Sequence, residues 1–203
     1  MKKEQHRYHH GHLAESLLDA VDAIASQFGI EAVTLRGCAR QVGVSPASAF
    51  RHYADKRALL TAFATRALSQ LADAMEVAKL AALERGSDPF HAVGMAYVEF
   101  ALTRPAFFRA MWREETIYAR DADYLAAAGR LAGYLQEGFA KTIADDDPNA
   151  FSPQELLAWS AVHGLASLFV DGPVARDSGP AQRLALADAV LRQLQPAFVR
   201  QPD

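Results

Sequence analysis

The stretch from Thr34 to Lys56, TLRGCARQVGVSPASAFRHYADK, constrains the fold of this chain more than any other part. Thr34 can cap the start of a first short helix, and Gly43 can adopt the positive φ that ends it. Ser45 followed by Pro46 is typical of the start of a second helix. The stretch therefore predicts two short helices joined by a glycine turn, an arrangement that fits the major groove of DNA.

The residues of this stretch divide into an apolar side and a polar side. The apolar side, expected to pack inward, holds Ala39, Val42, Val44, Ala49 and Phe50. The polar side holds Ser48, Arg51 and His52, with Lys56 just beyond. These side chains are donors suited to phosphates and base edges. Two helices and a glycine turn also occur in ordinary helical bundles, so the pattern alone leaves open that the charged residues only face solvent.

A longer series of residues stands in an order that is specific in combination. It comprises Tyr-His-His-Gly-His at 8–12, Leu17, Leu18, Phe28, Gly29, Thr34, Arg36, Ala39, Gly43, Val44, Ser45, Phe50, His52, Tyr53, Asp55, Lys56, Leu59 and Leu60. In this order the chain resembles the TetR/AcrR family of bacterial transcription regulators. The resemblance implies an all-α protein with a DNA-binding head, a small-molecule cavity and a homodimeric state.

The resemblance also implies which residues contact DNA. The family's contacting positions fall here on Arg36, Ser45, Pro46, Ala47, Ser48, Phe50, His52 and Lys56, to which the polar side adds Arg51. Phe50 departs from the family's usual tyrosine and lacks the hydroxyl that would bind a phosphate. Losing one neutral hydrogen bond costs on the order of 1 kcal/mol, which neighbouring cationic phosphate contacts can outweigh.

Helical periodicity extends on both sides of this motif. Leu13, Leu17, Val21, Ile24 and Phe28 recur at steps of three and four residues before Gly29, which predicts a first amphipathic helix. Asp55 is placed to cap a fourth helix that continues past residue 80. Proline and glycine then punctuate further helical patterns without strand alternation. We expect about nine helices and no sheet.

Length and composition indicate two domains. The chain has 203 residues, of which 51% are hydrophobic and 22% charged, enough for one large helical domain carrying a small one. We expect residues 1–56 to form an amino-terminal arm and a helix-turn-helix DNA-binding domain, with the motif at about 34–53. Residues 57–203 are then expected to form a ligand-binding and dimerisation domain.

The net charge of −3 is unevenly distributed along the chain. Residues 1–60 carry eight Lys and Arg against six Asp and Glu, whereas residues 61–203 carry thirteen against eighteen. A basic amino-terminal part would face phosphates and an acidic remainder would face away from them. Because no apolar run approaches the ~18 residues of a membrane span, we expect no membrane partner and a cytoplasmic location.

The middle and carboxy-terminal parts of the chain are rich in aromatic residues. Some of them are expected to fill the core and others to line a cavity for an unknown small-molecule effector. The candidates for that cavity are Tyr97, Phe100, Phe108, Trp112, Trp159 and His163.

A second interface is predicted near the carboxyl end. Ser152, Pro153 and Glu155 form the pattern of a capping box that starts a helix through residue 170. One face of that helix carries small and apolar residues, and the last helix offers a further apolar face. The candidates for a homodimer interface of four helices are Leu157, Ala161, Gly164, Leu168, Leu184 and Leu191. The His-Gly pair at 163–164 also resembles a TetR subgroup with a Trp-His-Gly marker, although Val162 replaces its tryptophan.

The sequence lacks the residues that a metal site or a catalytic site would need. The histidines at 6, 9, 10 and 12 have no partner cysteine or carboxylate at metal-ligand spacing, and we interpret them as an arm near DNA. His163 is eight residues from either Glu155 or Asp171 and has no nucleophile motif nearby. Cys38, the only cysteine, is expected to be a buried packing thiol. We therefore predict no metal, no cofactor and no catalytic residue.

These observations predict a repressor that binds a palindromic operator in double-stranded DNA as a homodimer and is released by a small molecule. The alternative is a helical ligand-binding or adaptor protein whose amino-terminal helices do not meet DNA.

Overall fold

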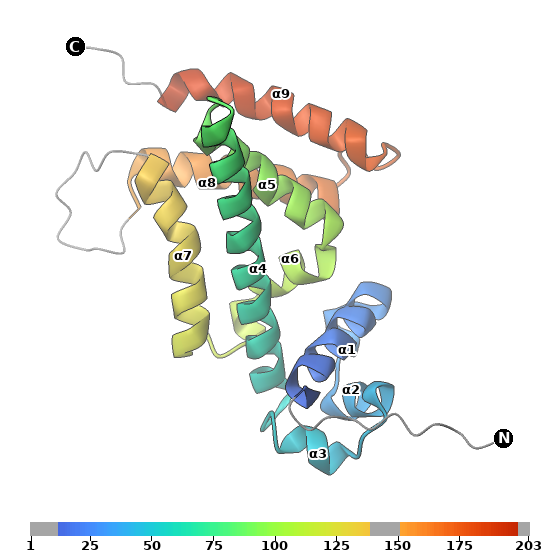
Figure 1. The fold of residues 1–203 in the computed structure, drawn as a ribbon. Helices are drawn as coiled ribbons and strands as arrows, with labels where there is room; N and C mark the ends of the chain where they lie inside the picture. The colour runs from blue at the N-terminus through green and yellow to red at the C-terminus, as the bar shows by residue number, and fades with distance from the viewer. Residues whose placement is uncertain (1–11, 139–150, 199–203) are drawn as a thin grey trace.

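The computed structural model describes residues 12–138 and 151–198 of the 203-residue chain (Figure 1). These residues form nine α-helices and no strand, which confirms the predicted fold class for the described parts of the chain. The α-helices are α1 Leu13–Phe28, α2 Leu35–Val42, α3 Pro46–Phe50, α4 Lys56–Glu84, α5 Pro89–Thr103, α6 Pro105–Met111, α7 Ala122–Gly138, α8 Pro153–Val170 and α9 Pro180–Phe198. Two short 3₁₀ helices, η1 Ile30–Ala32 and η2 Glu114–Thr116, follow α1 and α6.

The helix ends predicted around Gly43 are confirmed. Thr34 Oγ1 accepts a hydrogen bond of 2.9 Å from the backbone N–H of Gly37, and Ser45 Oγ accepts one of 3.2 Å from Ser48. Gly43 ends α2 in the left-handed conformation, with φ of 80° and ψ of 27°. A Cβ atom is strained at this positive φ, so glycine is favoured here. The left-handed residue turns the chain from α2 toward α3.

The long helix α4 connects two parts of the molecule. Its 29 residues extend about 44 Å at 1.5 Å per residue. Figure 1 shows α1, α2 and α3, which we call the head, gathered around the amino-terminal end of α4, while α9 crosses near its other end. Helices α5 to α9, which we call the body, include α5 and α7, the closest neighbours of α4. Buried residues along α4, such as Phe63 against Phe107 at 4.6 Å between ring centroids, make the core continuous between head and body.

Phe28 and Phe50 were predicted to pack inward, and both predictions are wrong because the chain turns at these residues. Phe28, the last residue of α1, is 66% exposed, since Gly29 redirects the backbone and Ile30 takes the buried place at 7%. Phe50 is 44% exposed at the end of α3, whereas its neighbour Ala49 is fully buried against the other head helices. Phe50 therefore belongs to the outer surface of the head and not to its core.

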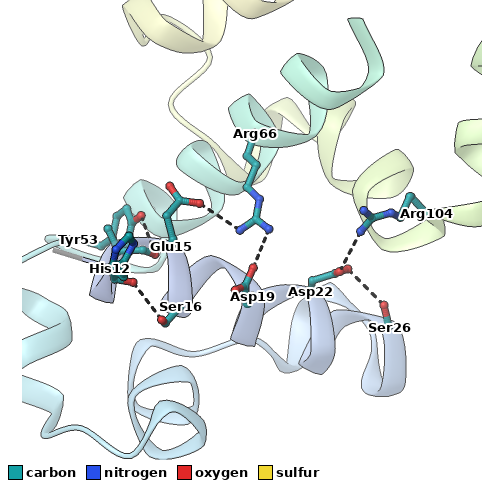
Figure 2. A network of polar contacts seen from close by, with 10 residues as sticks. His12, Glu15, Ser16, Asp19, Asp22, Ser26, Tyr53, Arg66 and Arg104 are labelled. Carbon is teal, nitrogen blue, oxygen red and sulfur yellow. Dashed lines mark hydrogen bonds and ion pairs between the residues drawn. The ribbon is translucent and has the colours of Figure 1, made fainter. Parts of the chain in front are cut away.

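Ion pairs between α1 and two arginines of α4 and the body hold the head in position. Arg66 on α4 lies 2.6 Å from Asp19 and 3.4 Å from Glu15, and Arg104 lies 3.7 Å from Asp22 (Figure 2). Each pair is partly exposed and is worth at most about 1 kcal/mol. Because the three carboxylates lie along one face of α1, the pairs together favour one orientation of the head over a rotated one.

No helix in the described ranges 12–138 and 151–198 combines the length and the apolar character that crossing a bilayer requires.

The left-handed turn at Gly43 generates a testable prediction about stability. Gly43→Ala should lower the free energy of unfolding by about 1 kcal/mol, because alanine is strained at positive φ although no atom lies within 4 Å of the added methyl group. The matched control is Gly133→Ala inside α7, where the methyl group also meets nothing within 4 Å and should stabilise by up to about 1 kcal/mol. Urea unfolding followed by circular dichroism measures both, and effects of the same sign would contradict the assignment.

Candidate nucleic-acid interface and internal cavity

The residues predicted to contact DNA lie on α2, on α3 and its N-cap, in the turn after α3 and, for Lys56, at the start of α4. Arg36, Ser45, Pro46, Ala47, Phe50, Arg51 and His52 are exposed, while Ser48 and Lys56 are partly buried. Ser48 joins its neighbours, since its Oγ lies 2.9 Å from Ser45 Oγ and accepts a hydrogen bond of 3.2 Å from Arg51 Nη2. This contact orders the Arg51 guanidinium beside the start of α3.

Lys56 makes a hydrogen bond to the head that the sequence did not predict. Its Nζ donates a hydrogen bond of 2.9 Å to the backbone carbonyl of Glu31 in η1. The ammonium group therefore stabilises the junction between η1 and α4. A phosphate contact by Lys56 would have to share this donor group with Glu31.

The charge of the α2–α3 surface is purely positive. Residues 34–54 include three arginines and no carboxylate. Arg40 is exposed on α2 and follows Arg36 by four residues, so both lie on one side of the helix. Arg40 was not among the residues predicted to contact DNA, although its spacing of four residues from Arg36 is visible in the sequence.

A cavity of about 410 Å³ lies within the body and next to α4. Its walls come from α4, α5, α7, α8 and α9 and from the segment that follows α6. Three of the predicted residues, Tyr97, Trp112 and Trp159, line it. The largest set of lining residues that the prediction missed lies on α7 and includes Tyr124, Leu131 and Tyr134. Their helical spacing was visible in the sequence, but the side of α7 that faces inward was not.

The other three predicted cavity residues lie behind the wall. Phe100 is turned into the core, where it stacks on Phe107 with ring centroids 6.3 Å apart and an interplanar angle of 9°. Phe108 is buried with its ring against the edge of Tyr97 at 6.2 Å. His163 packs against Trp112 at 5.4 Å between centroids and supports the lining residues from outside.

A partly buried hydrogen bond fixes the wall at this point. The Tyr97 hydroxyl and His163 Nδ1 are 2.9 Å apart. Burial lowers the pKa of His163 and raises the pKa of Tyr97, so both groups are neutral near pH 7. The pair thus orients Tyr97 without placing a charge beside the cavity. The two carboxylates considered as orienters of His163 are engaged elsewhere, Glu155 in the capping box with Ser152 and Asp171 with Arg109.

The predicted dimer residues divide into an outward and an inward group. On α8, Leu157 and Leu168 are 46% and 44% exposed, and a Cβ on Gly164 would meet no atom within 4 Å. Ala161 on the same helix and Leu184 on α9 are partly exposed. Leu191 is the exception, because it is 7% exposed and lines the cavity of its own chain. The outward leucine of α9 is Leu186, which is 41% exposed.

Cys38, the only cysteine of the chain, is buried in α2. Burial raises the pKa of Cys38 to about 11, in accord with a packing thiol. Across residues 12–138 and 151–198, no three His, Cys, Asp or Glu side chains lie close enough to share a metal ion. The histidines at 6, 9 and 10 lie outside the described residues.

Two family models match this chain. Residues 17–63 match the model described as bacterial regulatory proteins, tetR family, and residues 90–194 match the Tetracyclin repressor-like C-terminal domain. A curated relative, the uncharacterized HTH-type transcriptional regulator YobS of Bacillus subtilis strain 168, is 30% identical over 94 residues. That match spans 46% of this chain and 48% of YobS, so the chain covers about half the length of this relative.

Solved structures match nearly the whole chain. A protein of unknown function from Rhodococcus sp. RHA1 has 25% identity and a TM-score of 0.66, with 93% of this chain and 98% of that chain covered. A TetR family transcription regulator from Marinobacter aquaeolei VT8 has 21% identity and a TM-score of 0.55, with coverage of 89% and 95%. The TetR-like regulator LfrR from Mycobacterium smegmatis, solved in complex with proflavine, has 18% identity and a TM-score of 0.57, with coverage of 94% and 99%. At these identities the last two show a shared fold.

Proposed function

This chain belongs to the TetR family of bacterial regulatory proteins, and we propose that it acts as a homodimeric repressor that a small molecule releases from its operator. The observation that carries the proposal is the α2–α3 surface, with three arginines, no carboxylate and an ordered glycine turn. Phosphates attract such a surface in any sequence, and side chains at the start of α3 are positioned to reach base edges. We further propose that residues 1–56 form the DNA-binding domain and residues 57–203 the ligand-binding and dimerisation domain.

The arrangement of charges on the head supports DNA binding by its α2–α3 surface and not by the side that faces α4 and the body. The carboxylates of α1 are paired with Arg66 and Arg104, on the side of the head that meets α4 and the body (Figure 2). The arginines of α2 and α3 are exposed on the head. DNA would therefore meet positive groups while the head's negative groups are neutralised by α4 and the body.

A dimer would place two such heads on one DNA duplex. The outward residues of α8, together with Leu186 of α9, form an apolar surface that a second copy could cover in a four-helix interface. Twofold symmetry then requires the two α3 helices to be about 34 Å apart, which matches successive major-groove turns of a palindromic site.

Ligand control would reach the head through the segment from Trp112 to Tyr118. Trp112 and Glu114 line the cavity, whereas Arg113 between them pairs with Glu31 of the head. Because neighbouring residues of one short segment face the cavity and the head in turn, a displacement at the cavity wall would be transmitted over a single peptide unit.

The end of the same segment is fixed to the start of α4. The backbone N–H of Tyr118 donates to Thr61 Oγ1 at 2.8 Å, and its hydroxyl donates to Asp55 at 2.6 Å. Arg57 Nε donates to the carbonyl of Ile117 at 2.6 Å. The hydrogen bond from Tyr118 holds the pKa of the Asp55 carboxyl below its usual range, so this cap is charged at neutral pH.

Release requires a ligand that distinguishes two arrangements of the heads. A coupling free energy of about 3 kcal/mol would change operator affinity roughly 150-fold, which is sufficient for derepression. LfrR, a structural neighbour, was solved with a small molecule, which supports by analogy a binding role for the cavity here.

Binding to DNA from the region upstream of the chain's own gene tests the proposal, by fluorescence anisotropy over a salt series. Arg36→Ala should weaken binding to specific and unrelated DNA alike and reduce the slope of log affinity against log salt by roughly one, because one phosphate contact is lost. Arg85→Ala, at the opposite end of α4, is the matched control and should change neither value. If the wild-type chain bound no DNA even at low salt, it would be the ligand-binding or adaptor protein of the alternative.

The dimer proposal predicts an asymmetry between two adjacent leucines. Leu157→Glu should convert the dimer to a monomer, because it buries a charge in the proposed interface. Leu156→Glu is the control, since Leu156 is similarly exposed at 50% but lies about 100° around α8. Light scattering after size exclusion measures the mass, and a dimer that survives Leu157→Glu would place the interface elsewhere.

The coupling proposal predicts that Arg113→Ala separates DNA binding from ligand response. Operator affinity should change less than about threefold, because the exposed ion pair with Glu31 contributes little to stability. The effect of an effector on operator affinity should fall, because the link to the head is lost. Glu115→Gln removes the other carboxylate partner of Arg113 without touching the head and should leave the response intact. An equal response in all three proteins would exclude this route.

A further inference from the structure

The charged side chains among the described residues that line the cavity are carboxylates. Among the described residues that line it, seven are aromatic and none is lysine or arginine. Two carboxylates, Asp88 and Glu114, are part of the lining. Asp88 caps α5, so its charge is partly offset by the helix terminus, whereas Glu114 is an exposed residue of η2. His91, which also lines the cavity, has its Nε2 2.8 Å from Asp188 Oδ1.

Three cations close to the cavity are neutralised by partners outside it. Lys79 lies over the ring of Tyr134, and Arg113 and Arg130 are adjacent in sequence to lining residues. Each forms an ion pair with a carboxylate that does not line the cavity: Lys79 with Glu137, Arg113 with Glu31, and Arg130 with Asp73. None of them is therefore placed to attract an anionic ligand.

The walls are rich in π surface and their hydroxyl donors are occupied. Trp159 packs between Trp112 and Phe151, with centroid distances of 5.5 and 5.4 Å. The hydroxyl of Tyr124 donates to the backbone carbonyl of Met111 at 3.0 Å, and the hydroxyl of Tyr134 lies 3.0 Å from the Ala72 carbonyl and 2.9 Å from Glu76 Oε2. Aromatic faces attract cations. Trp112 Nε1 and His91 Nδ1 are buried donors of lining residues without a partner in the described parts of the chain, so the preference for a cation rests on the π faces and the carboxylates and not on a lack of donors.

The negative field reaches the tyrosines of the wall. Burial first, and then the charge of Glu114, raises the pKa of Tyr124. Burial, together with the hydrogen bond and charge of Glu76, raises the pKa of Tyr134 to about 12. Carboxylates thus oppose the formation of a negative charge at two separate points of the lining.

We propose that the cavity binds an aromatic organic cation and discriminates against carboxylates and other anions of the same size and shape. A volume of about 410 Å³ fits two or three fused rings with a small cationic substituent. The inference rests on the proposed function only in taking this cavity as the effector site.

Three acridines of nearly equal shape test the proposal at pH 8: cationic 9-aminoacridine, neutral acridine and anionic acridine-9-carboxylate. Calorimetric titration of the full chain without DNA gives each affinity. The cation should bind about fivefold tighter than the neutral compound and at least tenfold tighter than the anion, because a nearby carboxylate and aromatic faces favour it. Glu114→Gln should lower the affinity for 9-aminoacridine about fivefold and leave acridine unchanged.

Glu115→Gln is the matched control, since it removes an adjacent carboxylate that does not line the cavity, and it should preserve the preference for the cation. Equal binding of cation and anion, no binding of any acridine, or equal effects of the two substitutions would overturn the inference. Operator binding is measured separately on protein without acridine. If the protein bound no operator DNA but still preferred the cationic acridine, the DNA-binding role would be rejected and the preference for organic cations would stand.

Discussion

The start of α4 is the junction on which the arrangement of head and body depends. One oxygen of Asp55 accepts the Ala58 N–H at 2.8 Å and so begins the helix, while the other accepts the Tyr118 hydroxyl at 2.6 Å. The same carboxylate therefore joins the head, α4 and the segment that leaves the cavity. Arg57 in the first turn of α4 and Thr61 in its second turn hold that segment by further hydrogen bonds. Under our coupling proposal, a shift of this segment would change the direction of α4 relative to the head.

Opposite charges are separated along the molecule, and each has a physical role. The head exposes arginines on α2 and α3 and has its α1 carboxylates paired with α4 and the body, so its outer surface is suited to phosphates. The cavity holds carboxylates without lysine or arginine in its described lining. Under our proposals an organic cation could enter the body without competing for the surface that meets DNA. The net charge of −3 conceals this division, because it sums over both regions.

Local patterns predicted the features that are decided within a few residues. The caps at Thr34, Ser45 and Asp55, the capping box at Ser152 and the left-handed Gly43 all depend on hydrogen bonds or backbone angles inside one turn. Errors arose where a helix end turned the chain, as at Phe28 and Phe50, and where a side chain could face two neighbours. Leu191 lies on the apolar stripe of α9, but that stripe serves the cavity as well as the outer surface.

The sequence by itself determined the helices, their ends, the exposed polar side of α2 and α3 and the buried state of Cys38, because periodicity and capping act over short distances. It also indicated Tyr97, Trp112 and Trp159, among six candidates, for one cavity. Only the tertiary structure decided that Phe100 and Phe108 pack behind that cavity, that α7 supplies one of its walls and that Arg113 reaches Glu31. These contacts join residues far apart in the chain, and the angles at which helices cross select them, which no single segment encodes.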